Sequence, residues 1–445
     1  MNVPSIVAPG GSHDKALVAS AFGAEEVYLG VPFTSLRMRQ NKVYNFDQLK
    51  HTVDALHQNG TKAFLTMNIF PRNMDIKVFE NVVERIAGVN PDAIIFSDPG
   101  TFQIIRKYLP NTPLHLSTQT TTLNSAAVQF WYDLGVKRIV LARELHINEI
   151  AQIRKEVPDV ELEAFVHGAM CMTYSGRCLL GDYLGGRPGN KGECNHSCRF
   201  KYKVYIEEER RPGQLMEVEN NEGTEHILSS KDLCVIERLE EIMPHIHSMK
   251  IEGRSKSEFY VSAVVKAYKH VRDAIANGTP IDGNIKNLVN MIPHRSYWDG
   301  FLFHPLKEFP DGETTPLTKG GSEGNEQGVR DNTEIPPTPL YKRGSSTTHG
   351  TAGPLFNRNY FGTFTPNTIS QAGKVYHKIN PKEELRRGMK LQYIAPESMG
   401  ELEILDIVNQ QGKELEKADC NMQDIYVQTS LPLNGWESIY VEPNL

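Results

Sequence analysis

The chain alternates short apolar runs with longer amphipathic stretches. Runs rich in β-branched or apolar residues, each followed by a polar turn, lie at residues 5–8, 26–30, 63–68, 93–98, 114–118, 138–142, 162–167 and 248–252. Between them, apolar positions recur at helical spacing, and Ser12 and Asn45 stand where N-caps are expected. The predicted helices span residues 12–23, 45–60, 101–109, 125–135, 147–157, 232–242 and 255–277. The repeated strand–helix units predict an α/β fold, a closed (β/α)₈ TIM-like barrel of parallel strands.

The order of these units divides the chain. A doubly wound open sheet is the competing architecture, but no GxGxxG motif follows the first predicted strand. The connection after the seventh strand, residues 168–246, is far longer than a usual barrel loop, and such loops are usually functional. We therefore predict a barrel over residues 1–309 that contains this long cysteine-rich insertion. A flexible linker is predicted over residues 310–354, where Gly, Ser, Thr, Pro and Glu dominate, and a small C-terminal β-barrel domain over residues 355–445.

Polar residues gather at the predicted carboxyl ends of the strands, where barrel enzymes keep their chemistry. Alternation with period two places Glu163, Phe165 and His167 on one face of the seventh strand, pointing into the barrel. Lys250 and Glu252 share the equivalent face of the eighth strand. The strand-end set is Asn68, Asp98, Gln119, Arg143, Glu144, His167, Glu252 and Arg254. The alternative for any one of them is a buried polar layer whose members satisfy one another.

Composition is that of an ordinary globular protein, with 39% hydrophobic and 23% charged residues. The N-terminus has neither a basic nor an apolar signal region, and no run of eighteen apolar residues occurs. We therefore expect a cytoplasmic protein without membrane association, in a compartment where disulfides are rare. The net charge of −6 weighs mildly against a nucleic-acid partner, which would need a local basic patch.

Five of the six cysteines are clustered, with the spacing Cys171-x₆-Cys178-x₁₅-Cys194-x₃-Cys198-x₃₅-Cys234. Clustered thiolates in a reducing compartment usually bind metal, and soft sulfur selects zinc or iron–sulfur centres. Structural zinc favours paired knuckles, and only Cys194-x₃-Cys198 resembles one, so an iron–sulfur cluster fits better. A catalytic pair of Cys171 with His167 and buried structural thiols are the alternatives. Cys420 is interpreted as a small core residue.

Residues 163–178, EAFVHGAMCMTYSGRC, closely resemble the signature of the collagenase-like peptidase U-32 family. The resemblance continues through GEC at 192–194, CR at 198–199, RPG at 211–213, SKDLC at 230–234 and KIEGR at 250–254. It also includes APGG at 8–11 and SDPG at 97–100, and so spans roughly the first 300 residues. Within the family, the chain looks most like the members associated with 5-hydroxyuridine formation in tRNA.

This resemblance implies an oxygen-independent hydroxylation of the wobble uridine of tRNA, with prephenate as a co-substrate. It also implies a [4Fe-4S] cluster on Cys171, Cys178, Cys194 and Cys234, with Cys198 as the alternative fourth ligand. Family members that hydroxylate a 23S rRNA cytidine or the ubiquinone ring leave those substrates open. The appended β domain favours RNA, because quinone-hydroxylating members lack one, although the predicted linker departs from the family pattern.

The predicted barrel mouth supplies candidate roles for its polar residues. Arg143, Lys250 and Arg254 are expected to bind the carboxylates of prephenate, because cationic groups, guanidinium above all, pair with carboxylates. The expected catalytic residues are His167, Asp98 and Glu252, the first two as proton carriers.

A basic and aromatic stretch beyond the cysteines is a candidate RNA contact, with cations on phosphates and rings on unpaired bases. It contains Arg199, Lys201, Lys203, Arg210 and Arg211 with Phe200, Tyr202 and Tyr205, and Lys256, Lys266, Lys269 and Arg272 are candidates to extend it. A solvated hairpin and a solvated helix face are the alternatives.

Two further hypotheses of function stay open. A U-32-type peptidase or collagenase would use Cys171 and His167, since the chain has neither GxSxG nor HExxH. A non-enzymatic iron–sulfur scaffold, or one subunit of a hydroxylase pair, would act as a homo- or hetero-oligomer with a related subunit.

Overall fold

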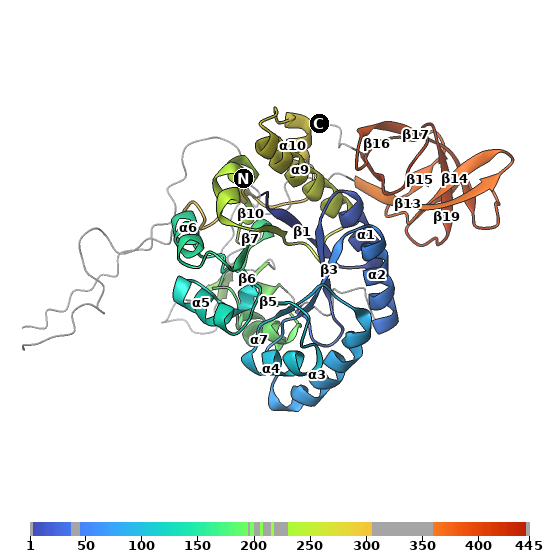
Figure 1. Cartoon of the computed structure of the whole chain (residues 1–445). Helices are drawn as coiled ribbons and strands as arrows, with labels where there is room; N and C mark the ends of the chain where they lie inside the picture. The colour runs from blue at the N-terminus through green and yellow to red at the C-terminus, as the bar shows by residue number, and fades with distance from the viewer. Residues whose placement is uncertain are drawn as a thin grey trace, which may run out of the picture.

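The barrel predicted from the alternating pattern is present. The computed structural model describes residues 3–36, 45–194, 196–199, 205–207, 215–217, 230–304 and 359–441. The parallel barrel strands are β1 (Ser5–Gly10), β2 (Glu26–Gly30), β3 (Lys62–Met67), β4 (Ala93–Phe96), β5 (Leu114–Leu116), β6 (Arg138–Val140), β7 (Glu161–Ala169) and β11 (Ser248–Ile251). Strand β11 pairs in parallel with both β7 and β1, which closes the sheet into a barrel (Figure 1). The predicted (β/α)₈ TIM-like fold is therefore confirmed.

Helices lie around the outside of this barrel (Figure 1). They are α1 (His13–Ala21), α2 (Phe46–Gln58), α3 (Asn73–Ile86), α4 (Pro99–Tyr108), α5 (Ser125–Asp133), α6 (Ile147–Glu156), α8 (Leu239–Ile242), α9 (Glu258–Asn277) and α10 (Gly283–Lys286). The two predicted N-caps are confirmed, since the side chains of Ser12 and Asn45 accept hydrogen bonds from first-turn amides. The helix predicted over residues 232–242 is wrong at its start, because β10 (Asp232–Cys234) pairs there with β7.

A buried ionic network fills the barrel interior near the amino ends of the strands. The guanidinium of Arg138 lies 2.6 and 3.0 Å from the two carboxylate oxygens of Glu26 and 3.1 Å from Glu163. The ammonium of Lys250 lies 2.5 Å from the other oxygen of Glu163, and all four side chains are buried. Mutual attraction offsets the desolvation of these charges, while the apolar core lies between the strands and the helices. These four residues therefore form a buried polar layer below the strand-end residues.

The C-terminal part forms a second, smaller barrel. Its antiparallel strands are β13 (Asn359–Gln371), β14 (Lys374–Ile379), β16 (Lys390–Ile394), β17 (Met399–Asn409), β19 (Ile425–Thr429) and β20 (Ser438–Val441), closed in the order β13-β14-β19-β17-β16-β20. Strands β15 (Leu385–Arg386) and β18 (Lys417–Ala418) pair with each other. The predicted C-terminal β-barrel is confirmed, whereas the predicted linker at 310–354 lies outside the described residues.

Helix α9 joins the two barrels. The buried ammonium of Lys266 donates to the backbone oxygens of Ala395 and Pro396 at 2.8 and 2.6 Å. Arg272, also buried, lies 2.8 Å from a carboxylate oxygen of Glu25. Both cations therefore serve internal contacts, and their predicted place in a basic RNA-binding surface is wrong.

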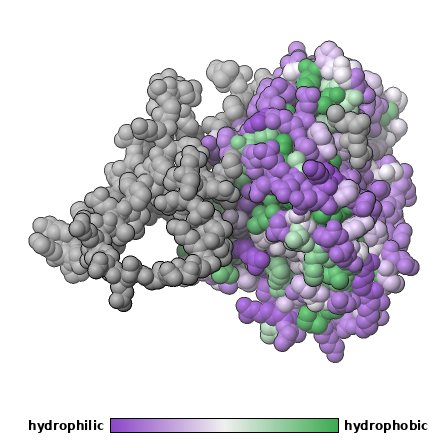
Figure 2. Space-filling model, turned by 60° about the vertical axis from the view of Figure 1, so that its left-hand side comes forward, coloured by the Kyte–Doolittle hydropathy of each residue, from purple (hydrophilic) through white to green (hydrophobic). Residues whose placement is uncertain are grey.

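The surface of the described residues is mainly hydrophilic. Figure 2 shows a face on which hydrophobic residues form separate patches within a polar surface. In the part of the chain that the structure describes, no helix combines the length and the apolarity needed to cross a bilayer.

Candidate active site at the barrel mouth

The segment between β7 and β11 contacts the loops at the carboxyl-terminal end of the barrel. It contains α7 (Leu180–Gly185), a hairpin of β8 (Tyr205–Glu207) and β9 (Leu215–Glu217), and β10, which also pairs with β12 (Tyr297–Trp298). Thr121, which follows β5, donates to the backbone oxygen of Ser175 at 2.6 Å. Glu144, which follows β6, accepts the Ser175 amide at 2.9 Å. The predicted insertion therefore lies at the catalytic end of the barrel.

One glycine allows this close approach. Gly176 has φ +75°, and a Cβ atom there would lie 1.9 Å from the backbone oxygen of Gln119. A left-handed conformation and this contact together exclude any other residue without local movement. The Ser-Gly-Arg-Cys part of the cysteine motif thus has a structural role beside its candidate metal ligand.

A polar cavity of about 90 Å³ opens among the carboxyl ends of the barrel strands. Its walls combine three cations, one carboxylate, small polar groups and two aromatic rings. They are Tyr28, Leu36, Thr66, Asn68, Ile95, Ser117, Thr118, Gln119, Val140, Arg143, Phe165, Lys250, Glu252 and Arg254. The structure therefore brings together five of the predicted strand-end residues with Lys250, and places them where barrel enzymes bind substrate.

Two arginines are held in place at this cavity. Arg143 donates to the backbone oxygen of Ala169 at 2.7 Å, and its guanidinium lies 3.7 Å from the ring centroid of Phe165. Arg254 donates to the hydroxyl of Thr66 at 3.1 Å and to the backbone oxygen of Leu36. Contacts of this kind orient a guanidinium before a ligand arrives.

Lys250 connects the cavity to the ionic network below it. Its ammonium pairs with Glu163 and lies 4.6 Å from the ring centroid of Tyr28. Burial lowers the pKa of Lys250, although the charge of Glu163 acts in the opposite direction. The charge of Lys250 therefore depends on the neighbouring carboxylate.

The two predicted catalytic carboxylates have different surroundings. Glu252 is buried and lines the cavity. Asp98 does not line it: its side chain accepts the Thr101 amide at 2.9 Å and caps α4. A helix cap explains Asp98 fully, so its position gives no support to a role as proton carrier.

His167 also lies away from the cavity. Strand β7 contains a register shift, so that Phe165 pairs with Lys250 but His167 pairs with Ile251. Because neighbouring residues of β11 face opposite sides of the sheet, the bulge turns His167 outward. Its ring packs at 5.4 to 5.9 Å from those of Tyr260, Tyr268 and Tyr297. The predicted orientation of His167 into the barrel is therefore wrong.

The buried position of His167 also determines its protonation. Burial lowers the pKa of its imidazole to about 3, with a smaller contribution from Lys256. The ring is thus neutral at physiological pH. Cys171, four residues on, is exposed, so the positions of these two residues do not support a catalytic pair.

The cysteines form no disulfide and lie at different depths. Cys171 is exposed, Cys178, Cys194 and Cys198 are partly exposed, and Cys420 is exposed rather than in the core as predicted. Cys234 faces His167 on the β7–β10 ladder, and burial raises the pKa of its thiol to about 11. Among the described residues, no three His, Cys, Asp or Glu side chains are gathered as metal ligands. The side-chain positions thus do not choose between Cys234 and Cys198 as the fourth ligand of the cluster that the resemblance implies.

Several cavity residues are absent from the predicted strand-end set, among them Tyr28 and Thr66. Alternation along β2 puts Tyr28 on the same face as Glu26, and this pattern could have predicted that Tyr28 points into the barrel. Thr66 lies within β3 rather than after it, so a search for residues at strand ends misses it.

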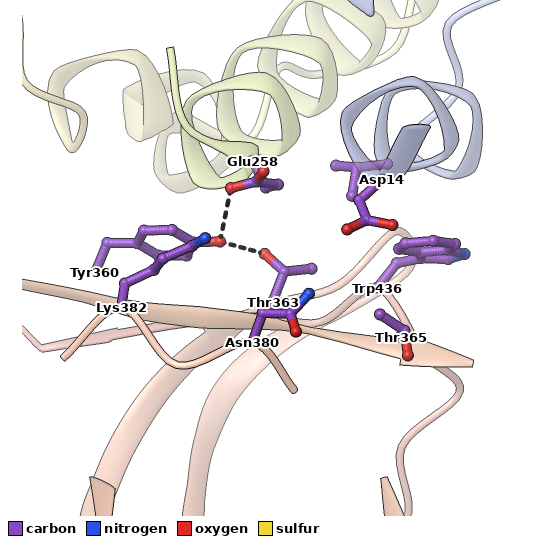
Figure 3. Close-up of a pocket in the computed structure, with 9 residues that line it drawn as sticks. Asp14, Glu258, Tyr360, Thr363, Thr365, Asn380, Lys382 and Trp436 are labelled. Atoms are coloured by element: carbon purple, nitrogen blue, oxygen red, sulfur yellow. Dashed lines mark hydrogen bonds between the residues drawn. The ribbon is translucent and has the colours of Figure 1, made fainter. Parts of the chain in front are cut away.

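A second, smaller cavity of about 30 Å³ lies between the two barrels (Figure 3). Asp14 of α1 and Glu258 of α9 face β13 across it, where the Tyr360 hydroxyl bonds to Glu258 at 3.4 Å and to Thr363 at 2.7 Å (Figure 3). Burial raises the pKa of Asp14, and the charge of Glu258 adds to the effect. This cavity is a polar joint between domains and is separate from the barrel mouth.

A closed parallel barrel with a polar cavity at the carboxyl ends of its strands is the architecture of a TIM-barrel enzyme. A family model described as Peptidase family U32 matches residues 11–308, more than half of the chain. The chain belongs to peptidase family U32, and the resemblance found in its motifs is confirmed.

Three similar proteins of known name differ in the function that their names state. The tRNA hydroxylation protein P of Haemophilus influenzae is 36% identical over 341 residues, which cover 67% of this chain and 74% of that protein. The 23S rRNA 5-hydroxycytidine C2501 synthase of Escherichia coli is 31% identical over 267 residues, covering 59% and 39%. A collagenase of Porphyromonas gingivalis is 29% identical over 310 residues, covering 66% and 72%.

Proposed function

We propose that this protein hydroxylates RNA, and that its substrate is the wobble uridine of tRNA, converted to 5-hydroxyuridine. The names of the relatives in Haemophilus influenzae and Escherichia coli support RNA hydroxylation. The observation that carries the proposal for this chain is the cation-lined cavity at the barrel mouth, beside a cysteine-rich segment. A protein acting on tRNA would work in the cytoplasm, as expected from the sequence.

The charge of the cavity favours an anionic co-substrate. The wall of the cavity contains three cationic side chains, Arg143, Lys250 and Arg254, and one carboxylate, Glu252. Its cationic groups therefore outnumber its anionic ones. Guanidinium groups match carboxylates in geometry as well as in charge. We therefore propose prephenate, a dicarboxylate, as the co-substrate bound by these three residues, with the uridine flipped out of its loop beside it.

The cysteines fit an iron–sulfur cluster in kind and number. None of them forms a disulfide, and five lie in the segment that contacts the barrel mouth. We propose Cys171, Cys178, Cys194 and Cys234 as the ligands of a [4Fe-4S] cluster, with Cys198 as the alternative fourth. Such a cluster would supply one-electron transfer near the cavity. Binding of the cluster would have to draw the thiols together, since the described side chains are not gathered as a metal site.

The residues of the chain itself would bind and orient the two substrates. Arg143 is fixed by Ala169 and Phe165, and Arg254 by Thr66, so both present their guanidinium groups without much reorganisation. Glu252, buried at the cavity wall, is the carboxyl group placed to hold or release a proton there.

A peptidase is less well supported. The relative named collagenase raises this function, but a nucleophile activated by His167 would need that ring beside Cys171. The imidazole instead packs among three tyrosines of α9 and β12.

The test is nucleoside mass spectrometry of RNA from a deletion strain that carries wild-type or variant genes. Arg254→Ala should lower tRNA 5-hydroxyuridine at least about tenfold, because a charge-assisted contact contributes roughly 1.5–3 kcal/mol. Arg254→Lys should restore part of it, and Arg85→Ala on the exposed face of α3 is the matched control.

Three results would change the assignment. Unchanged 5-hydroxyuridine in the deletion strain would remove tRNA as the substrate, and a loss of 5-hydroxycytidine from 23S rRNA would then identify rRNA instead. Cleavage of a collagen-like substrate by metal-free protein would favour a peptidase. Normal modification with folded Arg254→Ala protein would refute the role of that arginine alone.

A further inference from the structure

The insertion exposes an unusual number of large apolar and aromatic side chains within one short segment. Met172, Tyr174, Leu179, Tyr183 and Leu184 are 47%, 46%, 70%, 88% and 46% exposed. We call these five residues the rim surface. Tyr183 is the most exposed large hydrophobic residue found among the described residues. Large apolar side chains that are exposed together mark an interaction site more often than the same groups scattered singly.

Backbone contacts place parts of the rim surface together. The Tyr183 amide donates to the Leu179 oxygen at 2.9 Å, as in a helical turn, so these two side chains lie on the same side of α7. The Arg177 amide donates to the Tyr174 oxygen at 3.0 Å, which puts that tyrosine and a cation in one turn.

The rim surface adjoins the cavity. Ser175 and Gly176, which follow Tyr174, pack on Glu144 and Gln119, and Gln119 lines the cavity. A ligand on the Tyr174 end of the rim surface therefore lies next to the loop that lines the cavity.

Local charge favours a polyanion as the occupant. Residues 170–199 contain four basic residues, Arg177, Arg187, Lys191 and Arg199, against two acidic ones, Asp182 and Glu193, in a chain of net charge −6. Lys191 pairs with Asp75 of α3 at 2.9 Å, so the two exposed arginines carry the argument. Arg177 and Arg187 are exposed. Aromatic rings beside exposed cations suit single-stranded RNA, whose bases stack while its phosphates are neutralised.

We infer that the rim surface is the platform on which the RNA loop rests, with Tyr183 stacking on a base next to the target nucleotide. The inference rests on the proposed function and adds to it the residues that bind the substrate. A nucleotide that leaves its stack to enter the cavity removes a stacking partner from its neighbour. The exposed ring of Tyr183 would replace that partner.

The test is the affinity of the full chain for an anticodon stem-loop RNA, measured by fluorescence anisotropy at fixed salt. Tyr183→Ala should weaken binding about tenfold, within the range known for base–aromatic stacking. Tyr183→Phe should bind within about twofold of wild type, because the ring that stacks is kept. Phe130→Ala, which removes a 58% exposed ring from α5, is the matched control and should not change binding.

Salt dependence gives a second measurement. Arg187→Ala should reduce the slope of log K against log salt by about 0.7, the loss of one contact to a single-stranded phosphate. An unchanged slope would remove Arg187 from the interface.

The outcomes separate this inference from the proposed function. If Tyr183→Ala binds RNA as tightly as wild type and cells carrying it keep normal 5-hydroxyuridine, the rim surface is not an RNA platform while the proposed function stands. If Tyr183→Ala keeps its RNA affinity but loses a copurifying protein, the surface is a protein interface and the inference is wrong. If deletion leaves RNA nucleosides unchanged and wild type binds no RNA, both fail.

Discussion

Arg138 offers the sharpest test of how the barrel interior is stabilised. The substitution Arg138→Met keeps the unbranched stem of the side chain but removes the guanidinium group and its charge. Its guanidinium makes a bidentate pair with Glu26 and single contacts with Glu161 and Glu163 at 2.9 and 3.1 Å. Burial alone would lower the pKa of Arg138, but these carboxylates, above all Glu26, raise it above its ordinary value. The cation is thus present at every practical pH.

The expected loss follows from what is left behind. Without Arg138, the Glu26 carboxylate is left with the hydroxyl of Ser5 at 3.0 Å, while Glu163 keeps Lys250. Removing one partner of a buried ion pair costs roughly 3–5 kcal/mol, so we expect about 4 kcal/mol less unfolding free energy. Lys50→Ala breaks the exposed pair with Asp54 and should cost only about 0.3–0.5 kcal/mol.

The assay is urea unfolding of the full chain followed by tryptophan fluorescence. Trp131 and Trp298 lie in the large barrel and Trp436 at the joint between the barrels, so the assay is run in the Trp436→Phe background to follow the large barrel alone. Lowering the pH should shrink the deficit of the variant, because a proton neutralises a buried carboxylate that has lost its cation. A loss below about 1 kcal/mol, or one independent of pH, would refute a barrel interior held by charge pairing.

Three further predictions concern the insertion, the domain joint and the cysteines. Gly176→Ala should detach the insertion and speed its proteolysis, because a Cβ there would lie 1.9 Å from the backbone oxygen of Gln119. The control Gly186→Ala, at φ +59° with no atom within 4 Å, should cost only about 1 kcal/mol of backbone strain. Equal proteolysis of both variants would contradict this. Asp14→Asn should raise the melting temperature at pH 7. The folded-state pKa of Asp14 is raised, so its contribution to wild-type stability is full below the unfolded-state pKa of 3.8 and is lost as the pH rises through the folded-state pKa. The same melting temperature as wild type from pH 4 to 7 would count against a buried carboxyl at the joint. In anaerobic preparations assayed for iron and sulfide, Cys171→Ser and Cys234→Ser should lose the cluster and Cys198→Ser should keep it. If Cys198→Ser loses the cluster and Cys234→Ser keeps it, Cys198 is the fourth ligand.

Local patterns predicted the parts of this protein that depend on near neighbours. The eight strands, the capped helices and the small C-terminal barrel follow from periodicity, and Ser12 and Asn45 marked two helix starts correctly. The same reasoning placed Arg143, Glu252 and Arg254 at the mouth, because parallel strands bring their carboxyl ends to one edge.

Local patterns also gave wrong positions where a distant segment decided the outcome. Residues 232–234 carry a helical pattern, yet they form a strand because an edge of β7 is available to them. Lys266 and Arg272 look like solvated helix residues, but Ala395 and Glu25 from other parts of the chain bury them.

The amino-acid sequence by itself determined the barrel, the position of the cysteine-rich insertion and the family, since each depends on spacing or motif within a continuous segment. Only the tertiary structure decided which polar residues share the cavity. His167 shows why: one extra residue in β7 reverses the facing of its side chain, and such a shift depends on pairing with β11, some eighty residues away. The face that a strand residue occupies is a property of register, and register is set between segments rather than within one.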